Sequence, residues 1–468
     1  MNTIARILPY THAARLEIER RYFASINSVE SRAAANAIHS ALVELGVSFE
    51  GRRLPVSLRP TILSASEIDF AAWDLGGIRQ LLNRVLELAV ADLRAGQENT
   101  PILNFFDFYR PWFQIMAQEV RSHDHIMLMR YDAVRDSAGD FRLMEPNAAC
   151  PGGVIHCAYI REAWSQTTLG QALLRDTKII DRECDSPDGL IRLLYNISPR
   201  TPAPRIALCN YKGFFNNELS SLVRRNDLLR AQGLVDGELV ICDIRDISVV
   251  EGRAMVGGRQ IDVIYNKIDQ LMVNPSDPEI SGWIKASELE SCEFLNGLAA
   301  LYLGEAKSIF AALHDDEIRA SIGATPEEIE IINRRIPRTR MMIGRSSSPT
   351  YSELAEDRHR LVVKADALTR GAGVHVGKLE TSDSWGSALL NLARSNAIIQ
   401  DVLDVPQREA VLFDSDEADA IGNLYTEYWG VDFFFYGEMF AGVVGRAHSS
   451  MIFNVGNGGM EVPTFVIG

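Results

Sequence analysis

The first hundred residues carry apolar side chains at the spacing of helices that bury one face. Ala33 to Leu45 shows apolar residues three and four apart, and Ile78 to Leu93 repeats the pattern after a helix-start signal at residues 74–77. We find no catalytic motif in this segment. The pattern predicts a helical N-terminal region over residues 1–100.

Two segments of alternating character follow, HIMLMRYDAV and FRLMEPN, separated by the turn residues 136–140. This arrangement predicts a β-hairpin. Because strand side chains alternate between faces, two sets of residues are each predicted to share one face. They are Ile126, Leu128, Arg130 and Asp132 on the first strand, and Phe141, Leu143, Glu145 and Asn147 on the second.

The charged residues of this hairpin need partners, because burying a lone charge costs several kcal/mol. Oxygen atoms from Asp132, Glu145 and Asn147 would suit Mg²⁺, a hard cation that is usually shared with substrate phosphates. Arg130 could hold a phosphate or a developing acyl-phosphate charge. The pattern fits equally well a buried ion-pair network that only fixes the hairpin.

The middle of the chain changes to a pattern of alternating strands and helices. RIALCNY reads as a strand, Asn217 to Gln232 as a helix, and Glu238 to Asp243 and IDVIYNKID as further strands. We expect an α/β arrangement with at least one parallel strand pair, followed by helices from Ser291 to Leu313.

A glycine-rich turn lies near the end of the segment LVVKADALTRGAGVHVGK. A strand over residues 361–365 would present Lys364, and Arg370, Gly371 and Gly373 would form a flexible loop able to close over phosphate. A solvated lysine beside a surface hairpin is the alternative. Ala372 and Leu379 break the P-loop pattern, and Gly377 comes one residue too late for GxGxxG.

A short apolar strand that turns polar, residues 396–402, follows the glycine-rich turn. Gln400, Asp401 and Val402 could offer backbone groups to the edge of an adenine ring, with apolar residues flanking the ring. A plain core strand explains the same pattern.

Composition narrows the range of functions. The 468 residues are 47% hydrophobic and carry a formal net charge of -15, which argues against nucleic-acid and anionic-membrane binding. Six scattered cysteines form no CxxC pair, which argues against structural zinc and a disulfide framework. We see neither a signal peptide nor an apolar run of membrane-spanning length, so we expect a cytoplasmic protein.

Taken together, these motifs resemble the ATP-grasp superfamily, which includes D-alanine:D-alanine ligase and glutathionylspermidine synthetase. The resemblance implies that Arg130 is catalytic and that Asp132, Glu145 and Asn147 are Mg²⁺ ligands. It also makes Lys364 the second ATP lysine, with residues 370–373 as its lid loop. Lys307, within GEAKSIFAAL, stands where the first ATP lysine is expected.

The order of the motifs is similar to that of the circularly permuted ATP-grasp branch, because the hairpin precedes both lysines. The expected fold is therefore α/β: a circularly permuted ATP-grasp fold with an α/β, pre-ATP-grasp-like substrate subdomain and a helical N-terminal extension. The expected domains are a helical region (1–100), the metal-binding hairpin part of the core (101–200), the substrate subdomain (201–300), the ATP-binding lid (301–403) and closing core strands (404–468).

The resemblance implies an ATP-dependent carboxylate-amine ligase that uses ATP and Mg²⁺ and forms an acyl phosphate. Arg446, within GVVGRAH, is a further candidate for binding the acyl-phosphate oxygens, although an ion-paired or surface arginine fits equally well. The expected partners are a small carboxylate and an amine, such as an amino acid, a peptide or a polyamine-like molecule, and homodimerisation is left open. Two alternatives stand beside this: a nucleotide-binding scaffold or regulatory protein with a degenerate site, and a kinase on the same fold.

Overall fold

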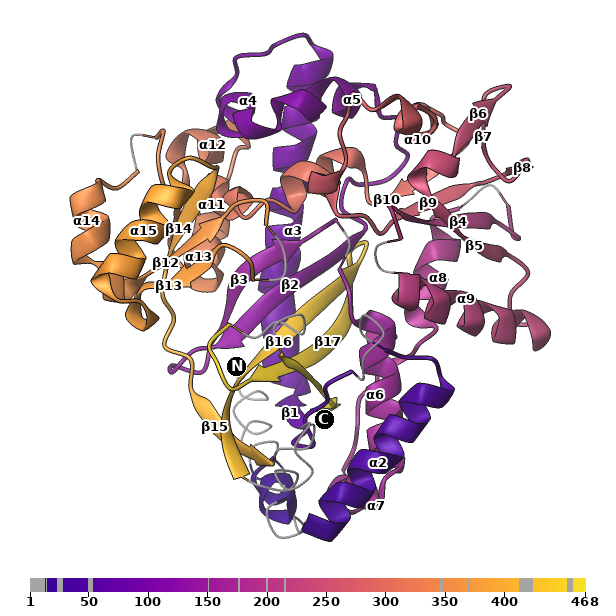
Figure 1. The fold of residues 1–468 in the computed structure, drawn as a ribbon, viewed down its shortest axis with the longest axis vertical. Helices are drawn as coiled ribbons and strands as arrows, with labels where there is room; N and C mark the ends of the chain where they lie inside the picture. The colour runs from indigo at the N-terminus through magenta and orange to yellow at the C-terminus, as the bar shows by residue number, and fades with distance from the viewer. Residues whose placement is uncertain are drawn as a thin grey trace.

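The fold is built around one antiparallel sheet. The computed structural model describes residues 13, 15–22, 28–48, 54–149, 151–175, 177–198, 201–213, 216–345, 348–368, 371–411, 424–452 and 458–468. The central sheet has the strand order β18-β17-β16-β2-β3, with β15 paired to β16 (Figure 1). Its strands are β2 (Leu128–Arg135), β3 (Phe141–Asn147), β15 (Gln407–Val411), β16 (Leu424–Tyr436), β17 (Met439–His448) and β18 (Met460–Val462).

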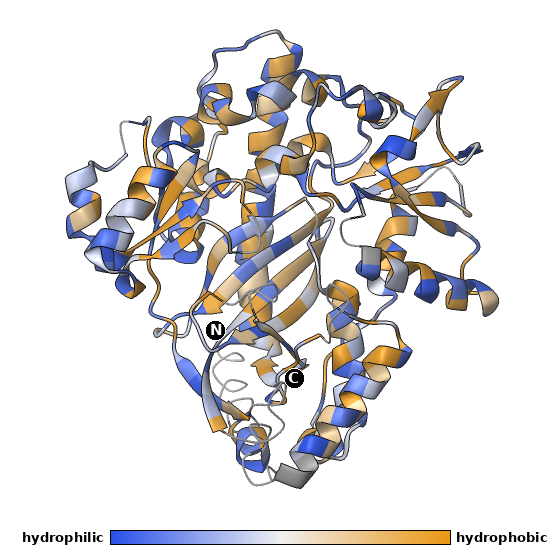
Figure 2. Ribbon diagram, in the orientation of Figure 1, coloured by the Kyte–Doolittle hydropathy of each residue, from blue (hydrophilic) through white to orange (hydrophobic). Residues whose placement is uncertain are grey.

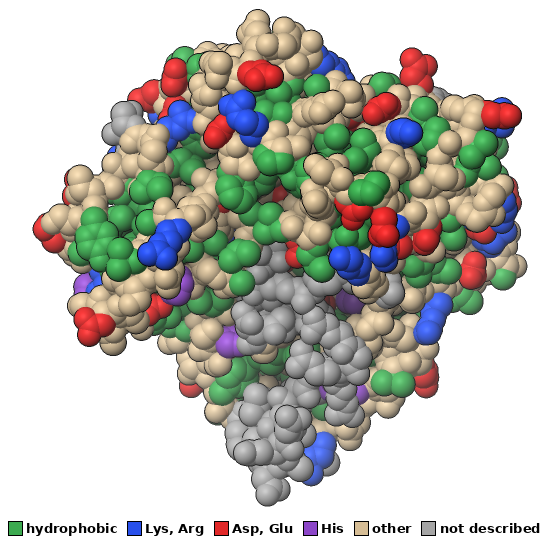
Figure 3. Space-filling model, turned by 45° about the horizontal axis from the view of Figure 1, so that its top comes forward, with side chains coloured by type: hydrophobic (Ala, Val, Ile, Leu, Met, Phe, Trp, Pro, Cys, Tyr) green, Lys and Arg blue, Asp and Glu red, His purple; other side chains and the backbone are tan. Residues whose placement is uncertain are grey.

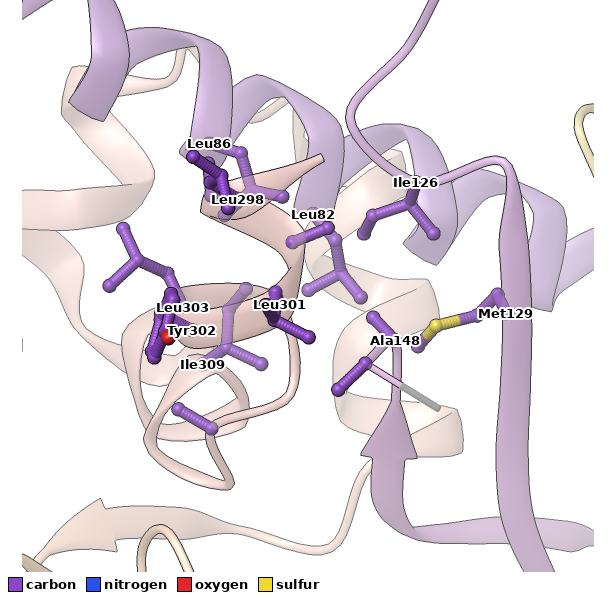
Figure 4. Close-up of a cluster of buried hydrophobic side chains, with 14 of the residues drawn as sticks. Leu82, Leu86, Ile126, Met129, Ala148, Leu298, Leu301, Tyr302, Leu303 and Ile309 are labelled. Carbon is purple, nitrogen blue, oxygen red and sulfur yellow. The ribbon is translucent and has the colours of Figure 1, made fainter. Parts of the chain in front are cut away.

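One long helix, α3 (Ala65–Arg94), covers the back of this sheet (Figure 1). Ser64 caps its first turn in a capping box with Glu67, which satisfies backbone N–H groups that the helix leaves unpaired. Leu82 and Leu86 of the helix lie in a cluster of buried apolar side chains from the hairpin and from residues 298–309 (Figure 4). Burial of this face explains the helical spacing of the sequence.

A parallel sheet with the order β10-β9-β4-β5 forms a separate α/β unit, which confirms the predicted arrangement. The prediction of helices starting at Ser291 is wrong at its beginning, because residues 293–295 form a strand parallel to β9. Short apolar runs do not distinguish the two structures. The elements are α8 (Gly189–Asn196), β4 (Arg205–Asn210), α9 (Asn216–Ala231), β5 (Glu238–Asp243), β6 (Ser248–Val250), β7 (Arg253–Val256), β8 (Arg259–Gln260), β9 (Val263–Asn266), α10 (Ser281–Ser287) and β10 (Glu293–Leu295).

A second antiparallel sheet, order β11-β14-β12-β13, lies on the opposite side of the central sheet from the α/β unit (Figure 1). It has a core of its own around Trp385, and its strands β12 and β14 confirm the strands predicted within residues 361–365 and 396–402. We call it the lid sheet. The elements of this part are α11 (Ser308–His314), α12 (Asp316–Ser321), α13 (Pro326–Arg335), β11 (Thr339–Met341), α14 (Tyr351–Glu356), β12 (Leu361–Ala365), β13 (Val374–Val376), α15 (Ser382–Leu392) and β14 (Ala397–Asp401).

The helices predicted in the first hundred residues are present, as α2 and within α3. A short strand interrupts the region, because β1 pairs in parallel with β19 near the C-terminal end. No helix in the described part of the chain is long and apolar enough to cross a membrane. The remaining elements are α2 (Ser28–Glu44), β1 (Thr61–Ser64), α4 (Pro101–Phe105), α5 (Phe113–Gln118), α6 (Val154–Gln166), α7 (Thr168–Leu174) and β19 (Thr464–Ile467).

A β-bulge in the hairpin corrects the predicted sharing of faces. Asp132 pairs with Glu145, but the next residue of β2, Ala133, pairs with Leu143, so Met144 is the extra residue. Leu143 therefore points away from Glu145 and packs with Phe141 in the core under α3. Ile126, which precedes β2, packs in that core too. The bulge leaves the polar residues on one face and moves the apolar residues of β3 to the other.

The hydropathy of the central strands agrees with a sheet that has one polar and one apolar face. Hydrophilic and hydrophobic stretches both occur along the strands of the central sheet (Figure 2), as expected for a sheet with one face on a core. On the face shown in Figure 3, Lys and Arg side chains lie among Asp and Glu side chains. Such mixing gives that face no extended basic surface for a phosphate backbone.

Candidate functional site

A hydrogen-bonded network joins three of the predicted hairpin residues. Arg130 lies directly across from Asn147 in the strand pair, as Asp132 does from Glu145. Nε of Arg130 donates to Oδ1 of Asp132 at 2.7 Å, and its Nη2 donates to Oδ1 of Asn147 at 3.0 Å. Nδ2 of Asn147 donates to Oδ1 of Asp132 at 2.8 Å. The two strands thus place these side chains together on the polar face.

Arg446 on β17 reaches the same network from a distant part of the chain. Its Nη2 donates to Oδ2 of Asp132 and, at 2.7 Å, to Oδ1 of Asp432 on β16. Burial alone would raise the pKa of Asp132, but Arg130 and Arg446 outweigh it and lower that pKa. Of the two alternatives for Arg446, the structure supports the ion-paired one in this state.

Asp432 is a member of the site that the sequence analysis missed. It is buried at 1% exposure and lies directly opposite Asp132 in the β2–β16 pairing. Burial raises its pKa, and the Asp132 carboxylate adds to this effect against the opposing effect of Arg446. The signal was present in GVDFFFY, where a single carboxylate interrupts an apolar strand and so requires a partner.

The ammonium groups of Lys364 and Lys307 lie close to residues of β3 in the hairpin. Nζ of Lys364 donates to the carbonyl of the bulged residue Met144 and to Oε1 of Gln400, both at 2.8 Å. Nζ of Lys307 donates to the carbonyl of Leu368 at 2.7 Å and lies 3.5 Å from Oε2 of Glu145. Burial lowers the pKa of Lys364 to about 8. The bulge therefore frees a carbonyl that helps to hold one of the two ammonium groups.

One cleft between the lid sheet and the hairpin collects most of the predicted residues. Three predicted residues contact side chains that line this cleft: Arg130, Asn147 and Lys307. Gly373 lies two residues after Gly371, in the turn between β12 and β13. Arg370 lies outside the described residues. Apolar side chains from both sheets complete the walls, including Val362, Val376 and Ile452. The predicted residues that line the cleft are Asp132, Glu145, Lys364, Gly371, Gln400, Asp401, Val402 and Arg446.

The turn between β12 and β13 depends on glycine. Gly371 and Gly373 have φ values of +74° and +66°, which side-chain-bearing residues rarely adopt. A Cβ atom on Gly373 would also approach Cβ of Ala365 to 2.7 Å. The backbone of this turn can therefore lie against β12 only with glycine at residue 373.

Two further carboxylates, Glu305 and the buried Asp366, were also missed by the sequence analysis. Oε2 of Glu305 accepts hydrogen bonds from the backbone N–H groups of Ala148 and Ala149, just past the hairpin. Asp366, at the end of β12, accepts hydrogen bonds from Ser308 and from Tyr109. Their signal was proximity to Lys307 and Lys364 in the sequence. These contacts attach the hairpin and the lid sheet to the segment that carries Lys307.

The backbone just beyond the hairpin contacts an acidic side chain of the α/β unit. The N–H group of Gly153 donates to Oε1 of Glu218 at 3.2 Å, and Lys267 contacts the same carboxylate at 3.0 Å. Nζ of Lys267 also donates to the carbonyl of Pro151 at 2.9 Å. The α/β unit is thereby attached to the chain directly beyond the hairpin.

The oxygen donors of the hairpin fit a hard cation in their chemistry. Among the described residues, no group of three or more His, Cys, Asp or Glu side chains could hold a metal ion, so the amide of Asn147 would have to complete the set. The carboxylate of Glu145 accepts no hydrogen bond from any described residue. Both oxygens of Asp132 are hydrogen-bonded to guanidinium groups, one of which would have to move aside.

Comparisons with known proteins agree with this fold. No family model matches the sequence. Uncharacterized proteins of Mycobacterium tuberculosis and Mycobacterium bovis are each 28% identical over 263 residues, and one of Mycobacterium leprae is 26% identical. The aligned region covers 53% of this chain and 44% of each relative, so the chain matches less than half the length of these relatives.

Among solved structures, a glutathione synthetase-like effector of Globodera pallida, in its apo form, matches with a TM-score of 0.58 at 10% identity. The match covers 93% of this chain and 96% of the effector. A protein from Methylobacillus flagellatus, described as a γ-glutamylcysteine synthetase, matches with a TM-score of 0.37 at 14% identity. The match covers 79% of this chain and 83% of that protein's chain. The chain therefore has a mixed α/β fold similar to that of the Globodera pallida effector.

Proposed function

We propose that this protein is an ATP-dependent ligase that joins a small carboxylate to an amine through an acyl phosphate, on a circularly permuted ATP-grasp fold. One observation carries the proposal. Two lysines and two arginines, from the lid sheet, the core and β17, converge on the face of the hairpin that presents Asp132 and Glu145. This distribution of charge suits the binding and transfer of a phosphoryl group.

The walls of the cleft support nucleotide binding. Apolar residues from the lid sheet can flank a flat ring, and the backbone of residues 400–402 can pair with its edge. Lys307 and Lys364 then hold the phosphates, since a charged ammonium group binds phosphate oxygen strongly. The turn at residues 371–373 closes over the phosphates and excludes water from a reactive intermediate.

Glu145, Asp132 and Asn147 would hold Mg²⁺, with Glu145 the carboxylate most open to it. When bound, the ion neutralises phosphate charge and polarises the transferring group. Glu145 lies 3.5 Å from Lys307, so the same residue also orients an ammonium group that contacts phosphate.

The chemistry proceeds in two displacements. A carboxylate oxygen of the first substrate attacks the γ-phosphorus, the bond to the bridging oxygen breaks, and ADP leaves. The amine then attacks the acyl carbon, the bond to the phosphate oxygen breaks, and inorganic phosphate leaves while the nitrogen gives up a proton. Arg130 and Arg446 neutralise the transferring group and the tetrahedral oxyanion once the substrate draws them from Asp132. The proposed acid and amine belong to the class of amino acids, peptides and polyamine-like molecules.

The order of elements supports the permuted assignment, since the hairpin of β2 and β3 precedes both Lys307 and the lid sheet in the chain. The structural likeness to a protein described as glutathione synthetase-like supports the synthetase class.

A second candidate function is nucleotide binding without turnover, in a scaffold or regulatory protein. A specific observation favours it: each oxygen of Asp132 accepts two hydrogen bonds, from Arg130, Arg446 and Asn147. In this second candidate function, Asp132 would be a structural group rather than a metal ligand.

Trapping with hydroxylamine tests the proposal without knowledge of the natural amine. The protein is incubated with Mg-ATP, hydroxylamine and one carboxylate at a time, and hydroxamate and ADP are measured. The proposal expects both products to depend on a carboxylate and to disappear in Glu145→Gln. A stable phosphorylated product without hydroxamate identifies a kinase. Nucleotide binding without turnover, across amino acids and peptides as carboxylates, identifies the scaffold.

A further inference from the structure

A second cavity, of about 540 Å³, lies at the outer edge of the lid sheet. Its walls come from β11 and the residues after it, from α11 and α12, from α13, and from Arg142 of β3. It shares Asp401 with the nucleotide cleft but none of the other residues of that cleft. A volume of this size falls in the range of small-molecule sites.

Five arginines line this cavity, in a protein whose formal net charge is -15. Three carboxylates also line it, of which Asp316 pairs with Arg319 and Asp315 caps the first turn of α12. Arg142 lies 3.6 Å from Asp136, outside the cavity wall. The five are Arg142, Arg319, Arg338, Arg340 and Arg345.

Three of these guanidinium groups have no ion-pair partner in the described part of the chain. Within the described residues, no ion pair within 4 Å involves Arg338, Arg340 or Arg345. The guanidinium group of Arg345 lies 4.4 Å from the ring centre of Phe105. Nε of Arg340 is buried and has no hydrogen-bond partner in this part of the chain. Nε of Arg142, from the facing strand, is buried without a partner in the same way. Buried donors of this kind are normally satisfied by an acceptor.

The positive potential of the cavity also reaches a histidine in its wall. The pKa of His314 is lowered to about 4, chiefly by burial and then by Arg319, Arg338 and Arg142. His314 is therefore neutral at physiological pH. All three arginines lower the pKa of this one side chain, so their charges lie near the same part of the cavity.

We propose that this cavity is a second anion site, separate from the nucleotide cleft, that binds a small phosphorylated molecule bearing a diphosphate or two phosphate groups. Planar guanidinium groups bind phosphate oxygens in pairs. A single carboxylate would offer only two oxygen atoms to the three guanidinium groups that lack an ion pair. The volume is too small for a folded macromolecular partner.

Such a ligand would join two parts of the fold. Arg338, Arg340 and Arg345 belong to the edge of the lid sheet, whereas Arg142 belongs to the central hairpin and Arg319 to α12. The carbonyl of Arg338 accepts a hydrogen bond from the N–H group of Asp401 at 3.0 Å, beside Gln400 in the nucleotide cleft. An anion bound here would therefore restrain the lid sheet where it flanks the cleft.

Calorimetric titration with inorganic pyrophosphate at low ionic strength tests the site. The 468-residue chain is first saturated with ADP, so that pyrophosphate can reach only the second cavity. The variant Arg338→Gln/Arg340→Gln is expected to weaken pyrophosphate binding by about tenfold or more, since hydrogen bonds to charged groups contribute more than those between neutral groups. The matched control Arg110→Gln/Arg230→Gln removes the same charge from exposed residues elsewhere and is expected to bind as the wild type does.

Three outcomes overturn the proposal: no pyrophosphate binding by the wild type, equal affinity in the Arg338→Gln/Arg340→Gln variant, and an equal loss in the control. A fourth is a loss in Lys364→Met alone, which would assign pyrophosphate to the nucleotide cleft. None of these measurements uses turnover. Failure of the ligase proposal in the hydroxylamine assay is therefore distinguishable from failure of the second site.

Discussion

Asp132 of β2 and Asp432 of β16 lie directly opposite each other in antiparallel strands, and one nitrogen of Arg446 donates hydrogen bonds to both carboxylates. Like charges in this relation repel each other. Both residues are buried, so water does not screen that repulsion. Arg446, together with Arg130, therefore allows two acidic residues to share one polar face.

Loss of Arg446 is expected to destabilise the protein strongly. Removing one partner of a buried ion pair typically costs about 3–5 kcal/mol, because the charge that is left has no compensation. We expect Arg446→Met to lower the free energy of unfolding by about that amount in urea titrations. Adding Asp432→Asn removes the repelling charge and should restore part of the loss. Equal stability of the single and double variants would contradict this role.

Substitution of Glu145 separates function from folding. The side chain is about one quarter exposed, at 26%, and its one ion pair, with Lys307, is long at 3.5 Å. Glu145→Gln should therefore leave the free energy of unfolding nearly unchanged while it abolishes ADP release and hydroxamate formation. Glu98→Gln, at an exposed residue, is the control for handling and charge. Activity near that of the control would remove Glu145 from the proposed metal site.

Regular patterns allowed much of the fold to be predicted. The hairpin follows from alternation bounded by turn residues, and the strands that carry Lys364 and Asp401 follow from short apolar runs. The requirement that Arg130 and Asp132 have partners also followed from their strand setting, and the structure supplies those partners.

Tertiary features were beyond that reasoning. The bulge at Met144 arises from pairing between strands, so alternation within β3 could not show that Leu143 and Glu145 point to opposite faces. Arg446 contacts Asp132 across 314 residues of sequence, a proximity set by the order of strands in the sheet. Residues 293–295 form a strand because they complete the parallel sheet, which no local signal indicates.

Glu305 should make the stability of the protein depend on pH. Burial raises its pKa from the usual 4.5 to about 7, against the hydrogen bonds from Ala149 and Ala148. A raised folded-state pKa gives a contribution that is fully present below pH 4.5 and is lost as the pH rises through about 7. Urea titrations should show that Glu305→Gln flattens the fall in stability across this window relative to the wild type. An unchanged pH profile in the variant would contradict the assignment.

Nucleotide affinity should fall in the alkaline range because of Lys364. Its pKa is lowered to about 8 by burial, so the ammonium group that binds phosphate loses its proton as the pH rises above this value. We expect the dissociation constant for ADP to rise by up to about tenfold for each pH unit above about 8, since one proton is linked to binding. Calorimetry on Lys364→Met should show weaker binding without this slope. Lys378→Met, a substitution beyond the lid turn, should keep both the affinity and the slope of the wild type, and a slope that persists in Lys364→Met would assign the titration to another group.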